Sequence, residues 1–282
     1  MGLRIQNNIE AFNTHRQLTA TASQASKSME KLSSGYRINR AADDAAGLGI
    51  SEKMRGQIGG LAQAQKNAQD GISAVQTAEG ALSEVHSMLQ RVRDLKVQFN
   101  NGTLDDNDKT SISSEVAEIA KEVNSIVNST EFNGKSVFKS DFSFQVGAND
   151  SETISFAATG LSGDISTGGL SNFSSISDTA TASTALASNS GGLSGLDKID
   201  ALIENVSKAR GQLGAVQNRL EHRLTNLATY QENLTASESR IRDVDMASEM
   251  TKFTKLNILQ QAGTSMLAQA NQAPQGVLSL LR

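Results

Sequence analysis

The adjacent carboxylates Asp43 and Asp44 are the residues in this sequence best placed to do chemistry, as a metal-binding or acid–base pair. They lie in a polar stretch, 32–50, that separates two segments with helical apolar periodicity. Carboxylates just before a helix also accept hydrogen bonds from its free N–H groups and favour its dipole. We therefore expect the pair to start a helix, and a metal-dependent hydrolase remains the alternative.

The other polar residues form no recognisable active site. The three histidines, His15, His86 and His222, are scattered, and His15 lies on an apolar face where we expect it to be packed. Gly47 and Gly49 lack the third glycine of a dinucleotide-binding loop. The absence of cysteine excludes disulfides and thiolate metal sites. The sequence thus predicts no enzyme, no cofactor and no metal.

The composition is typical of long helical bundles. The chain of 282 residues has one proline, no tryptophan and only 4% aromatic residues, so its core must use aliphatic side chains. A net charge of −4 without a basic run argues against nucleic acid as a partner. No membrane-spanning run or secretory signal is visible, which predicts a cytoplasmic protein unless export needs no cleaved signal.

Two weak apolar stripes lie near the ends of the chain and predict helices that need partners. The first runs through Phe12, His15, Leu18, Ala22, Ala25, Met29 and Leu32. The second runs through Met246, Met250, Phe253, Leu256, Leu259, Ala262, Met266 and Ala270. Beyond Pro274 the chain finishes in an apolar tail, 277–281. We expect the two helices to pair and to pack against other copies, with a membrane-active amphipathic protein as an alternative.

The middle of the chain carries the strongest periodicity. A near-heptad seam over 54–99 and a matching one over 196–241 predict two long antiparallel helices, with a shorter helix over 112–126. Alternating residues at 142–146 and 153–156 predict a β-hairpin. The fold class is thus mainly α: a long coiled-coil-like antiparallel helical bundle with a small β-hairpin, plus a terminal two-helix coiled coil.

The polar stretches 32–50 and 237–245 mirror each other and indicate a nested arrangement of domains. Gly35 is placed to end the first helix in a left-handed conformation, and with Gly47, Asp43 and Asp44 it forms the predicted inter-domain joint. The expected domains are 1–44 with 243–282 as a terminal assembly domain, and 45–156 with 196–242 as the bundle. Residues 157–195, rich in Ser, Thr and Gly, are expected to be a loop-rich variable surface insert.

Several motifs together resemble bacterial flagellin. They are Leu32-Ser-Ser-Gly-Tyr-Arg-Ile-Asn39, Asp43-Asp-Ala-Ala-Gly-Leu48, Leu89-Gln-Arg-Val-Arg-Asp-Leu95, Glu131-Phe-Asn-Gly134, Phe144-Gln-Val-Gly-Ala-Asn149 and Val277-Leu-Ser-Leu-Leu-Arg282. The resemblance covers roughly the first 156 and the last 90 residues in order. The chain is similar to a minimal member of the family, without large outer domains.

The resemblance implies a structural subunit that self-assembles into the extracellular flagellar filament for swimming, with terminal helices that fold on polymerisation. It implies export through the flagellar type III apparatus, and a chaperone, a filament cap and hook-junction proteins as partners. The hook–filament junction protein is the alternative. The residues expected to pack between subunits are Phe12, Leu18, Met29, Leu32, Met250, Phe253, Leu256, Leu259 and Met266.

The resemblance also implies recognition of the first bundle helix by toll-like receptor 5 of animal hosts. The matching positions are Arg91 and Leu95, with Glu115 placed by its distance from Phe132-Asn-Gly134.

Overall fold

The computed structural model describes residues 8–156, 176, 178–187 and 195–280. Within these ranges the chain forms six helices and two two-stranded antiparallel sheets, which confirms the predicted fold class. The chain divides into a terminal unit, Met1–Ile58 with Glu232–Arg282, and a bundle unit, Gly59–Gln231. The elements are α1 (Ile9–Ser34), α2 (Ala45–Phe99), α3 (Asp106–Ser129), β1 (Glu131–Phe132), β2 (Lys135–Ser136), β3 (Phe142–Gln145), β4 (Thr153–Phe156), α6 (Thr179–Ala187), α7 (Leu196–Arg242) and α8 (Met246–Leu280).

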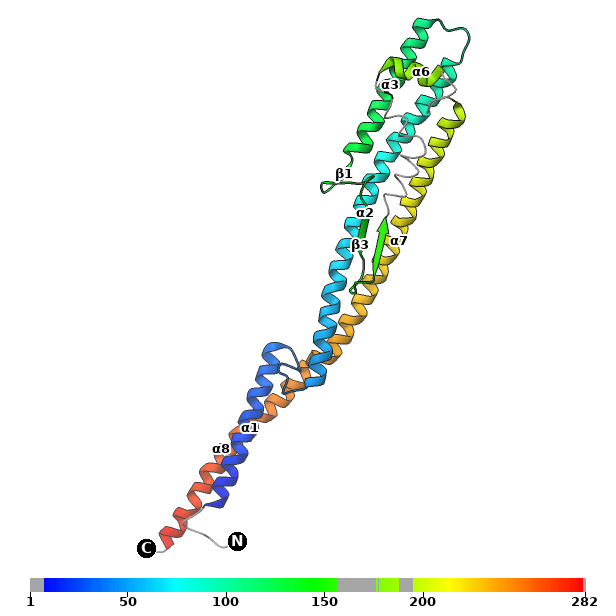
Figure 1. The fold of residues 1–282 in the computed structure, drawn as a ribbon. Helices are drawn as coiled ribbons and strands as arrows, with labels where there is room; N and C mark the ends of the chain where they lie inside the picture. Colours follow the sequence, from blue (N-terminus) through cyan, green and yellow to red (C-terminus); the bar gives the residue numbers. More distant parts are fainter. Residues whose placement is uncertain (1–7, 157–175, 177, 188–194, 281–282) are drawn as a thin grey trace. The chain divides into compact units, whose positions relative to one another are not determined.

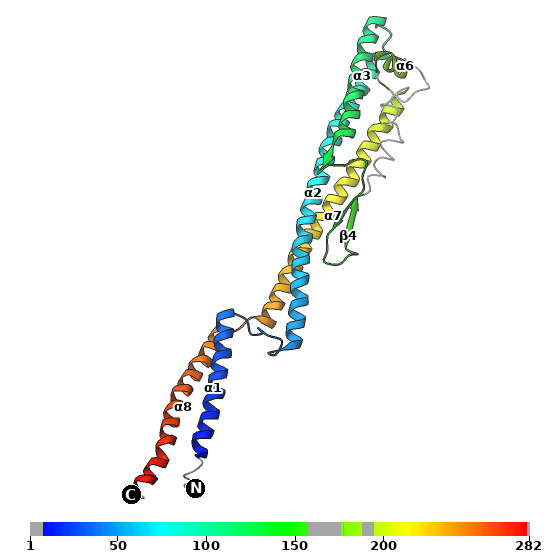
Figure 2. The ribbon, with the colours of Figure 1, turned by 60° about the vertical axis from the view of Figure 1, so that its left-hand side comes forward.

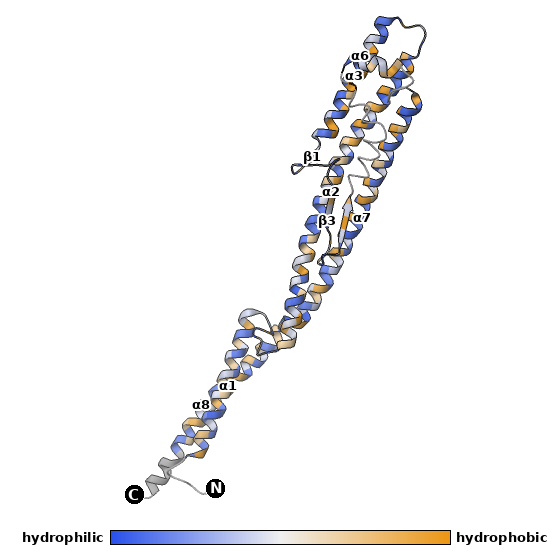
Figure 3. Ribbon diagram, in the orientation of Figure 1, coloured by the Kyte–Doolittle hydropathy of each residue, from blue (hydrophilic) through white to orange (hydrophobic). Residues whose placement is uncertain are grey.

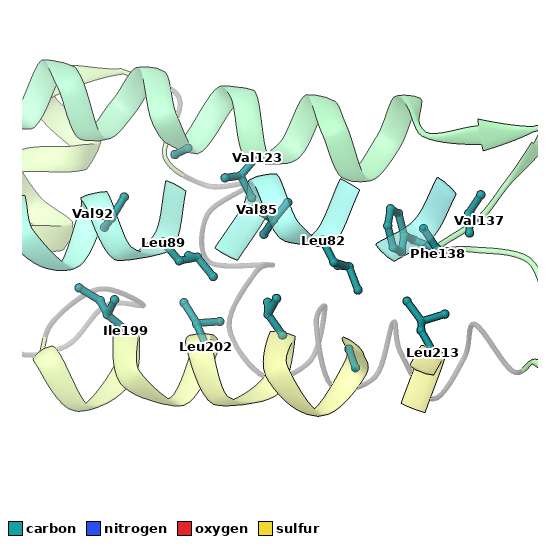
Figure 4. Packing of buried hydrophobic residues seen from close by; sticks show 14 of the residues in the cluster. Leu82, Val85, Leu89, Val92, Val123, Val137, Phe138, Ile199, Leu202 and Leu213 are labelled. Atoms are coloured by element: carbon teal, nitrogen blue, oxygen red, sulfur yellow. The ribbon is translucent and has the colours of Figure 1, made fainter. Parts of the chain in front are cut away.

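In the bundle unit, α2 and α7 run antiparallel and α3 packs beside them (Figure 1). Two contacts establish the opposite directions of α2 and α7. Arg93 of α2 pairs with Asp200 near the start of α7, and Gln65, earlier in α2, donates a hydrogen bond to Gln231, later in α7. Their facing residues are aliphatic and point into one core (Figure 4), as the heptad pattern predicts. The labelled core residues are Leu82, Val85, Leu89, Val92, Val123, Val137, Phe138, Ile199, Leu202 and Leu213.

The predicted hairpin is present: β3 pairs antiparallel with β4, with Phe142 opposite Phe156 and Gln145 opposite Thr153. It lies against α2, where a Cβ added to Gly71 would stand only 3.0 Å from the Phe144 ring. Asn67 of α2 donates a hydrogen bond of 3.1 Å to the Gln145 carbonyl. A glycine at position 71 therefore lets the aromatic ring approach the helix backbone.

A second, shorter hairpin of β1 and β2 was not predicted. Asn133 and Gly134 both have positive φ, at 51° and 74°, which is the conformation of a tight two-residue hairpin turn. The strands are only two residues long, too short for an alternating pattern to be visible in the sequence.

The expectation of a loop-rich, poorly packed insert is wrong for residues 178–187. They include α6, which packs against α3 with Ala182 and Leu186 buried. Lys96, 4% exposed, donates a hydrogen bond to the Leu186 carbonyl, and its ammonium lies 5.7 Å from the Phe99 ring centroid. Burial lowers the pKa of Lys96. Residues 157–175, 177 and 188–194 of the insert lie outside the described residues.

In the terminal unit, α1 and α8 lie side by side in both ribbon views (Figure 2) and run antiparallel. Ser28 Oγ donates a 2.5 Å hydrogen bond to Glu249 Oε1 near one end of the pair. Asn8 donates one of 2.7 Å to the Ala270 carbonyl near the other end. The helix α8 continues through Pro274 to Leu280.

The two units divide at Ile58/Gly59 and at Gln231/Glu232. Both divisions lie closer to the middle of the sequence than the expected boundaries at 44/45 and 242/243. The first turns of α2 belong to the terminal unit because they contact two of its segments, 35–38 and 241–244, which we call the crossing segments. Gly47 approaches Ile38 so closely that an added Cβ would lie 2.8 Å from Ile38 Cδ1. Arg242 forms a 2.7 Å ion pair with Glu52.

Candidate functional site

Asp43 and Asp44 accept backbone hydrogen bonds, as a structural role predicts. Asp44 Oδ1 accepts from the N–H of Gly47 at 2.9 Å, which makes Asp44 the cap of α2. Asp43 Oδ2 instead accepts from the N–H groups of Arg40 and Asn39, at 3.0 and 3.2 Å, and so caps the preceding turn. These bonds, that from Arg40 first, hold the pKa of the Asp43 carboxyl below its usual value. The expectation that the pair starts a helix is correct for Asp44 only.

The four predicted joint residues, Gly35, Asp43, Asp44 and Gly47, all lie inside the terminal unit. Gly35 has φ of 76° and its N–H bonds to the Lys31 carbonyl, so it ends α1 in the left-handed conformation that glycine favours. At Gly47 an added Cβ would meet Asp44 Oδ2 at 2.5 Å. Position 47 therefore requires glycine because the Asp44 side chain leaves no room for a Cβ atom. Position 35 requires glycine because its backbone has a positive φ.

Two segments that are far apart in sequence, 35–38 and 241–244, are paired beside this cap. The N–H of Arg37 donates to the Arg242 carbonyl at 2.6 Å, and that of Val244 donates to the Gly35 carbonyl at 3.0 Å. The Arg242 guanidinium lies 4.7 Å from the Tyr36 ring centroid while it pairs with Glu52. The hydrogen bond from Arg242 is the main reason why the pKa of Glu52 is lowered.

No metal centre is visible in the part of the chain that the structure describes: no group of three or more His, Asp or Glu side chains is placed to hold an ion. Both carboxylates that suggested a hydrolase already accept backbone hydrogen bonds. The arrangement around Asp43 and Asp44 is thus suited to holding the backbone and offers no reacting group.

The predicted stripe on α1 is divided between two faces. The less exposed positions follow strict three–four spacing through Ala11, Thr14, Leu18, Thr21, Ala25, Ser28 and Leu32, and this face packs on α8. Phe12 lies one residue beyond Ala11, about 100° further round the helix, and its side chain is 70% exposed. Met29 is 55% exposed, and His15, expected to be packed, is exposed as well.

The stripe on α8 is divided in the same way. Its less exposed positions are Glu249, Phe253, Leu256, Gln260, Gly263, Leu267 and Ala270, which face α1. Met250, Leu259 and Met266 are exposed instead. Met250 and Leu259 are nine residues apart, which is about half a turn round an α-helix, so no single face can contain both. The sequence stripe combined residues of opposite faces.

The seam between α1 and α8 therefore mixes small and polar residues with a few large apolar ones, Leu18, Leu32, Phe253, Leu256 and Leu267, while other large apolar side chains remain on the outside of both helices. Figure 3 shows hydrophobic residues distributed along both helices. The exposed set in the terminal unit is Ile9, Phe12, Met29, Tyr36, Ile50, Met246, Met250, Ile258, Leu259 and Met266. Sequence reasoning missed Ile9, Ile50 and Ile258 because they fall outside the stripes.

Two of these exposed residues, Ile258 and Leu259, line an open groove on α8. The groove has a volume of about 450 Å³ and lies among Thr251, Thr254, Lys255, Ile258 and Leu259. Ile258 is 61% exposed there. Exposed apolar surface of this kind is typical of a protein interface.

The residues expected at a receptor contact lie on the bundle unit. Arg91 of α2 and Glu115 of α3 form a 2.7 Å ion pair, and both side chains are exposed. Leu95, by contrast, is 2% exposed and belongs to the bundle core. Its side chain is not part of the surface that Arg91 and Glu115 present.

Within the described residues, no helix combines the length and the apolar character needed to cross a lipid bilayer.

Comparison with known proteins gives the family. The chain matches the bacterial flagellin N-terminal helical region over residues 5–143 and the bacterial flagellin C-terminal helical region over residues 196–281. It is 50% identical to a flagellin of Bacillus subtilis strain 168, over 99% of this chain and 100% of that protein. It is 50% identical to a flagellin of Halalkalibacterium halodurans, over 99% of each chain.

Two further matches are more distant. The chain is 43% identical to the flagellar filament 33 kDa core protein of Treponema phagedenis, over 99% of each chain. The crystal structure of Bacillus cereus flagellin is matched with 30% identity and a TM-score of 0.45, over 57% of this chain and 88% of that one. The resemblance read from the sequence motifs is confirmed, and this chain belongs to the bacterial flagellin family.

Proposed function

We propose that the protein is a structural subunit, not an enzyme, that self-assembles into the extracellular flagellar filament used for swimming. The observation that carries this proposal is the terminal unit, where two paired helices bury mostly small and polar residues between them and leave many large apolar ones exposed. A single copy gains little by displaying Phe12, Ile258 and Leu259 to water, whereas neighbouring copies can cover them. The flagellin relatives and family regions support the same function, and nothing in them supports the hook-junction alternative.

Assembly and folding of the terminal unit are coupled in this proposal. Conformational entropy opposes ordering of α1 and α8, and their seam buries few large apolar side chains to offset it. The remaining stabilisation comes from neighbouring subunits, through those predicted packing residues that are exposed in the single chain, Phe12, Met29, Met250, Leu259 and Met266. The other predicted packing residues, Leu18, Leu32, Phe253 and Leu256, already face the partner helix of the same chain. Hydrogen exchange tests this: in the monomer α1 and α8 exchange freely while residues 59–99 are protected, and in the filament both are protected.

A pair of variants in one turn of α8 tests whether the exposed apolar residues drive assembly. We expect Ile258→Ser with Leu259→Ser to abolish growth of filaments from seeds, while Lys255→Ser, in the same groove, grows normally. Circular dichroism checks that the monomers are equally helical. Normal filaments from the double serine variant would contradict the proposal.

Deletion of the residues after Gln272 is a second test. The truncated chain keeps the bundle unit, and we expect it to remain a soluble monomer that does not polymerise. Filaments of normal length from this chain, seen by electron microscopy, would show that the C-terminal segment is dispensable.

The family also suggests the route and the partners. We expect export by the flagellar type III apparatus without a cleaved signal, with a chaperone bound to the C-terminal segment. A filament cap and hook-junction proteins would meet the subunit at the two ends of the polymer. Secretion of the full chain by cells that lack the general secretory route supports this, and loss of secretion there would contradict it.

Recognition by toll-like receptor 5 is a second proposed function, favoured by the exposed Arg91–Glu115 ion pair. Arg91 and Glu115 would contact the receptor, and Leu95 would support the helix surface from the core. Receptor activation by purified monomer should fall for Arg91→Ala and not for Lys121→Ala, an exposed lysine on α3 that pairs with Glu118. Equal responses to both variants would remove this proposal.

A further inference from the structure

The bundle unit has an open groove where the tip of the β3–β4 hairpin meets α7. Its volume is about 550 Å³. From α7 it is lined by Arg219, His222, Arg223 and Asn226, which recur at three- and four-residue spacing on one face of the helix, and from the hairpin by Val146 and Glu152. Basic side chains and an amide dominate the helical wall, which is the chemistry that receives carboxylates.

One of the two arginines in this groove is already engaged. Arg223 donates to the Val146 carbonyl at 3.1 Å and to Glu152 Oε1 at 3.0 Å, and these contacts fix the hairpin to α7. Arg219 has no ion-pair partner among the residues that the structure describes. Since the Glu152 carboxylate is neutralised by Arg223, the groove keeps the positive charge of Arg219 beside the polar groups of His222 and Asn226. Asp150, at the hairpin tip, is exposed.

The same unit carries an acidic turn between α2 and α3. Asp105, Asp106 and Asp108 lie there, and all three are exposed. Asp105 and Asp108 cap α3 reciprocally, because each accepts a hydrogen bond from the other's backbone N–H. Asp106 takes no part in that cap. The turn thus presents a rigid cluster of carboxylates with one member free to bind elsewhere.

The groove and the acidic turn are too far apart to meet within one molecule. The hairpin is fixed to α2 at Asn67, and the turn follows the end of α2 at Phe99. The 32 intervening helical residues span about 50 Å at 1.5 Å per residue. Figure 1 likewise shows the turn between α2 and α3 at the end of the bundle away from the β3–β4 hairpin.

We propose that the groove around Arg219 binds the Asp105–Asp108 turn of a second copy of this chain. The contact is between two different surfaces, so it repeats head to tail and produces an open polymer with no closed dimer. It rests on the proposed function of self-assembly and adds to it an electrostatic contact made by the bundle units, separate from the apolar faces of α1 and α8. Because both surfaces are exposed, the contact acts mainly on the rate at which subunits add, and salt weakens it.

Charge reversal at two matched positions tests the contact. Arg219→Glu leaves the Arg223–Glu152 pair in place, and Asp106→Lys leaves the cap of α3 in place. We expect each variant to slow seeded elongation about tenfold at low salt, and the chain carrying both changes to recover most of the wild-type rate. Lys198→Glu, a charge reversal at an exposed position elsewhere on α7, controls for net charge and should elongate normally.

The outcomes separate this inference from the proposed function. If wild-type monomers add to no seeds, the proposed function fails. If wild type elongates and Arg219→Glu elongates equally fast, the function stands and the groove contact is overturned. Slowing by both single variants without recovery in the combined chain also overturns it, because the two charges then act on different partners.

Discussion

The bundle unit and the terminal unit use helices of similar regularity but bury very different residues. In the bundle, Leu82, Leu89 and Leu202 pack into a continuous aliphatic core. Between α1 and α8, Thr21 and Ser28 are among the most buried residues, and Phe12 faces outward. The comparison shows that helical periodicity indicates which face of a helix makes contact. The size of the apolar side chains on that face decides whether the contact is stable in a single chain.

The largest expected effect comes from truncating one leucine in each region. Leu89→Ala should lower the free energy of unfolding of the monomer by about 2–5 kcal/mol, because it leaves a cavity in a closed core. Leu256→Ala removes a leucine that is also buried, in the seam of α1 and α8, and should leave the monomer's unfolding unchanged while it weakens filaments. Urea titration followed by circular dichroism measures the free energy of unfolding of each monomer. Sedimentation of filaments measures how much Leu256→Ala weakens assembly. Equal destabilisation of the two monomers would remove the distinction between the units.

Glycines at helix contacts give a second comparison. Gly71→Ala would press a methyl group against the Phe144 ring at 3.0 Å and should cost about 1–3 kcal/mol of bundle stability. Gly263→Ala would meet only the end of the Leu18 side chain, at 3.2 Å, which can rotate away. Since alanine favours a helix by up to about 1 kcal/mol over glycine, the second change should be neutral or stabilising in filaments. Thermal unfolding followed by circular dichroism measures both, and a Gly71→Ala chain as stable as wild type would contradict the docked hairpin.

A third pair of variants concerns the crossing segments of the terminal unit. Gly47→Ala should destabilise filaments by about 1–2 kcal/mol, because the methyl group collides with Asp44 and with buried Ile38. Gly49→Ala is the matched control, since an added Cβ there meets nothing within 4 Å. The temperature at which filaments dissociate should fall for the first variant and hold for the second. The same fall in both would mean that helix flexibility, and not the closeness of Ile38, requires glycine.

The smallest effect expected is the pH dependence of Glu249. Burial disfavours its charge, but the hydrogen bond from Ser28 and the charge of Lys252 outweigh burial and hold its pKa below 4.5. A carboxyl with a lowered pKa in the folded state stabilises that state above pH 4.5, and the gain is lost as the pH falls through the folded pKa.

Glu249→Gln should therefore weaken filaments by about 1 kcal/mol at pH 7, with the difference from wild type shrinking as the pH falls below 4.5. Filament dissociation measured at each pH tests this, with Glu84→Gln, an exposed residue of α2, as control. A constant difference across the range would show that Glu249 is not ionised in the seam.

The sequence was sufficient to predict the helices and buried faces of the bundle unit. For the terminal unit it predicted the helices but only part of their buried faces. Seams such as 54–99 contain one strong aliphatic stripe, so the periodicity identified both the helix and its buried face. On α1 and α8 the buried positions hold Thr, Ser, Gln and Gly, which hydrophobicity does not mark, and the apolar residues lie partly outside. The predicted stripes therefore combined Leu18 and Leu256, which face the partner helix, with Phe12 and Met250, which do not.

Two other features could not be predicted from hydrophobic periodicity or local motifs. The helix α6 lies in a Ser- and Thr-rich stretch, and it is held through long-range contacts with Lys96 and α3 that no local pattern records. The groove at Arg219 depends on a hairpin whose residues are about 70 positions away in the chain, as the Arg223–Glu152 contact shows. In both cases tertiary contacts decide the outcome.

The seam of α1 and α8 has one more consequence, for the axial alignment of these helices. Small residues at three–four spacing offer almost the same surface after a slip of one heptad, about 10 Å along the axis. The bonds Ser28–Glu249 and Asn8–Ala270 are satisfied at one alignment only. These two hydrogen bonds therefore favour one axial alignment of α1 against α8, together with the few large side chains of the seam.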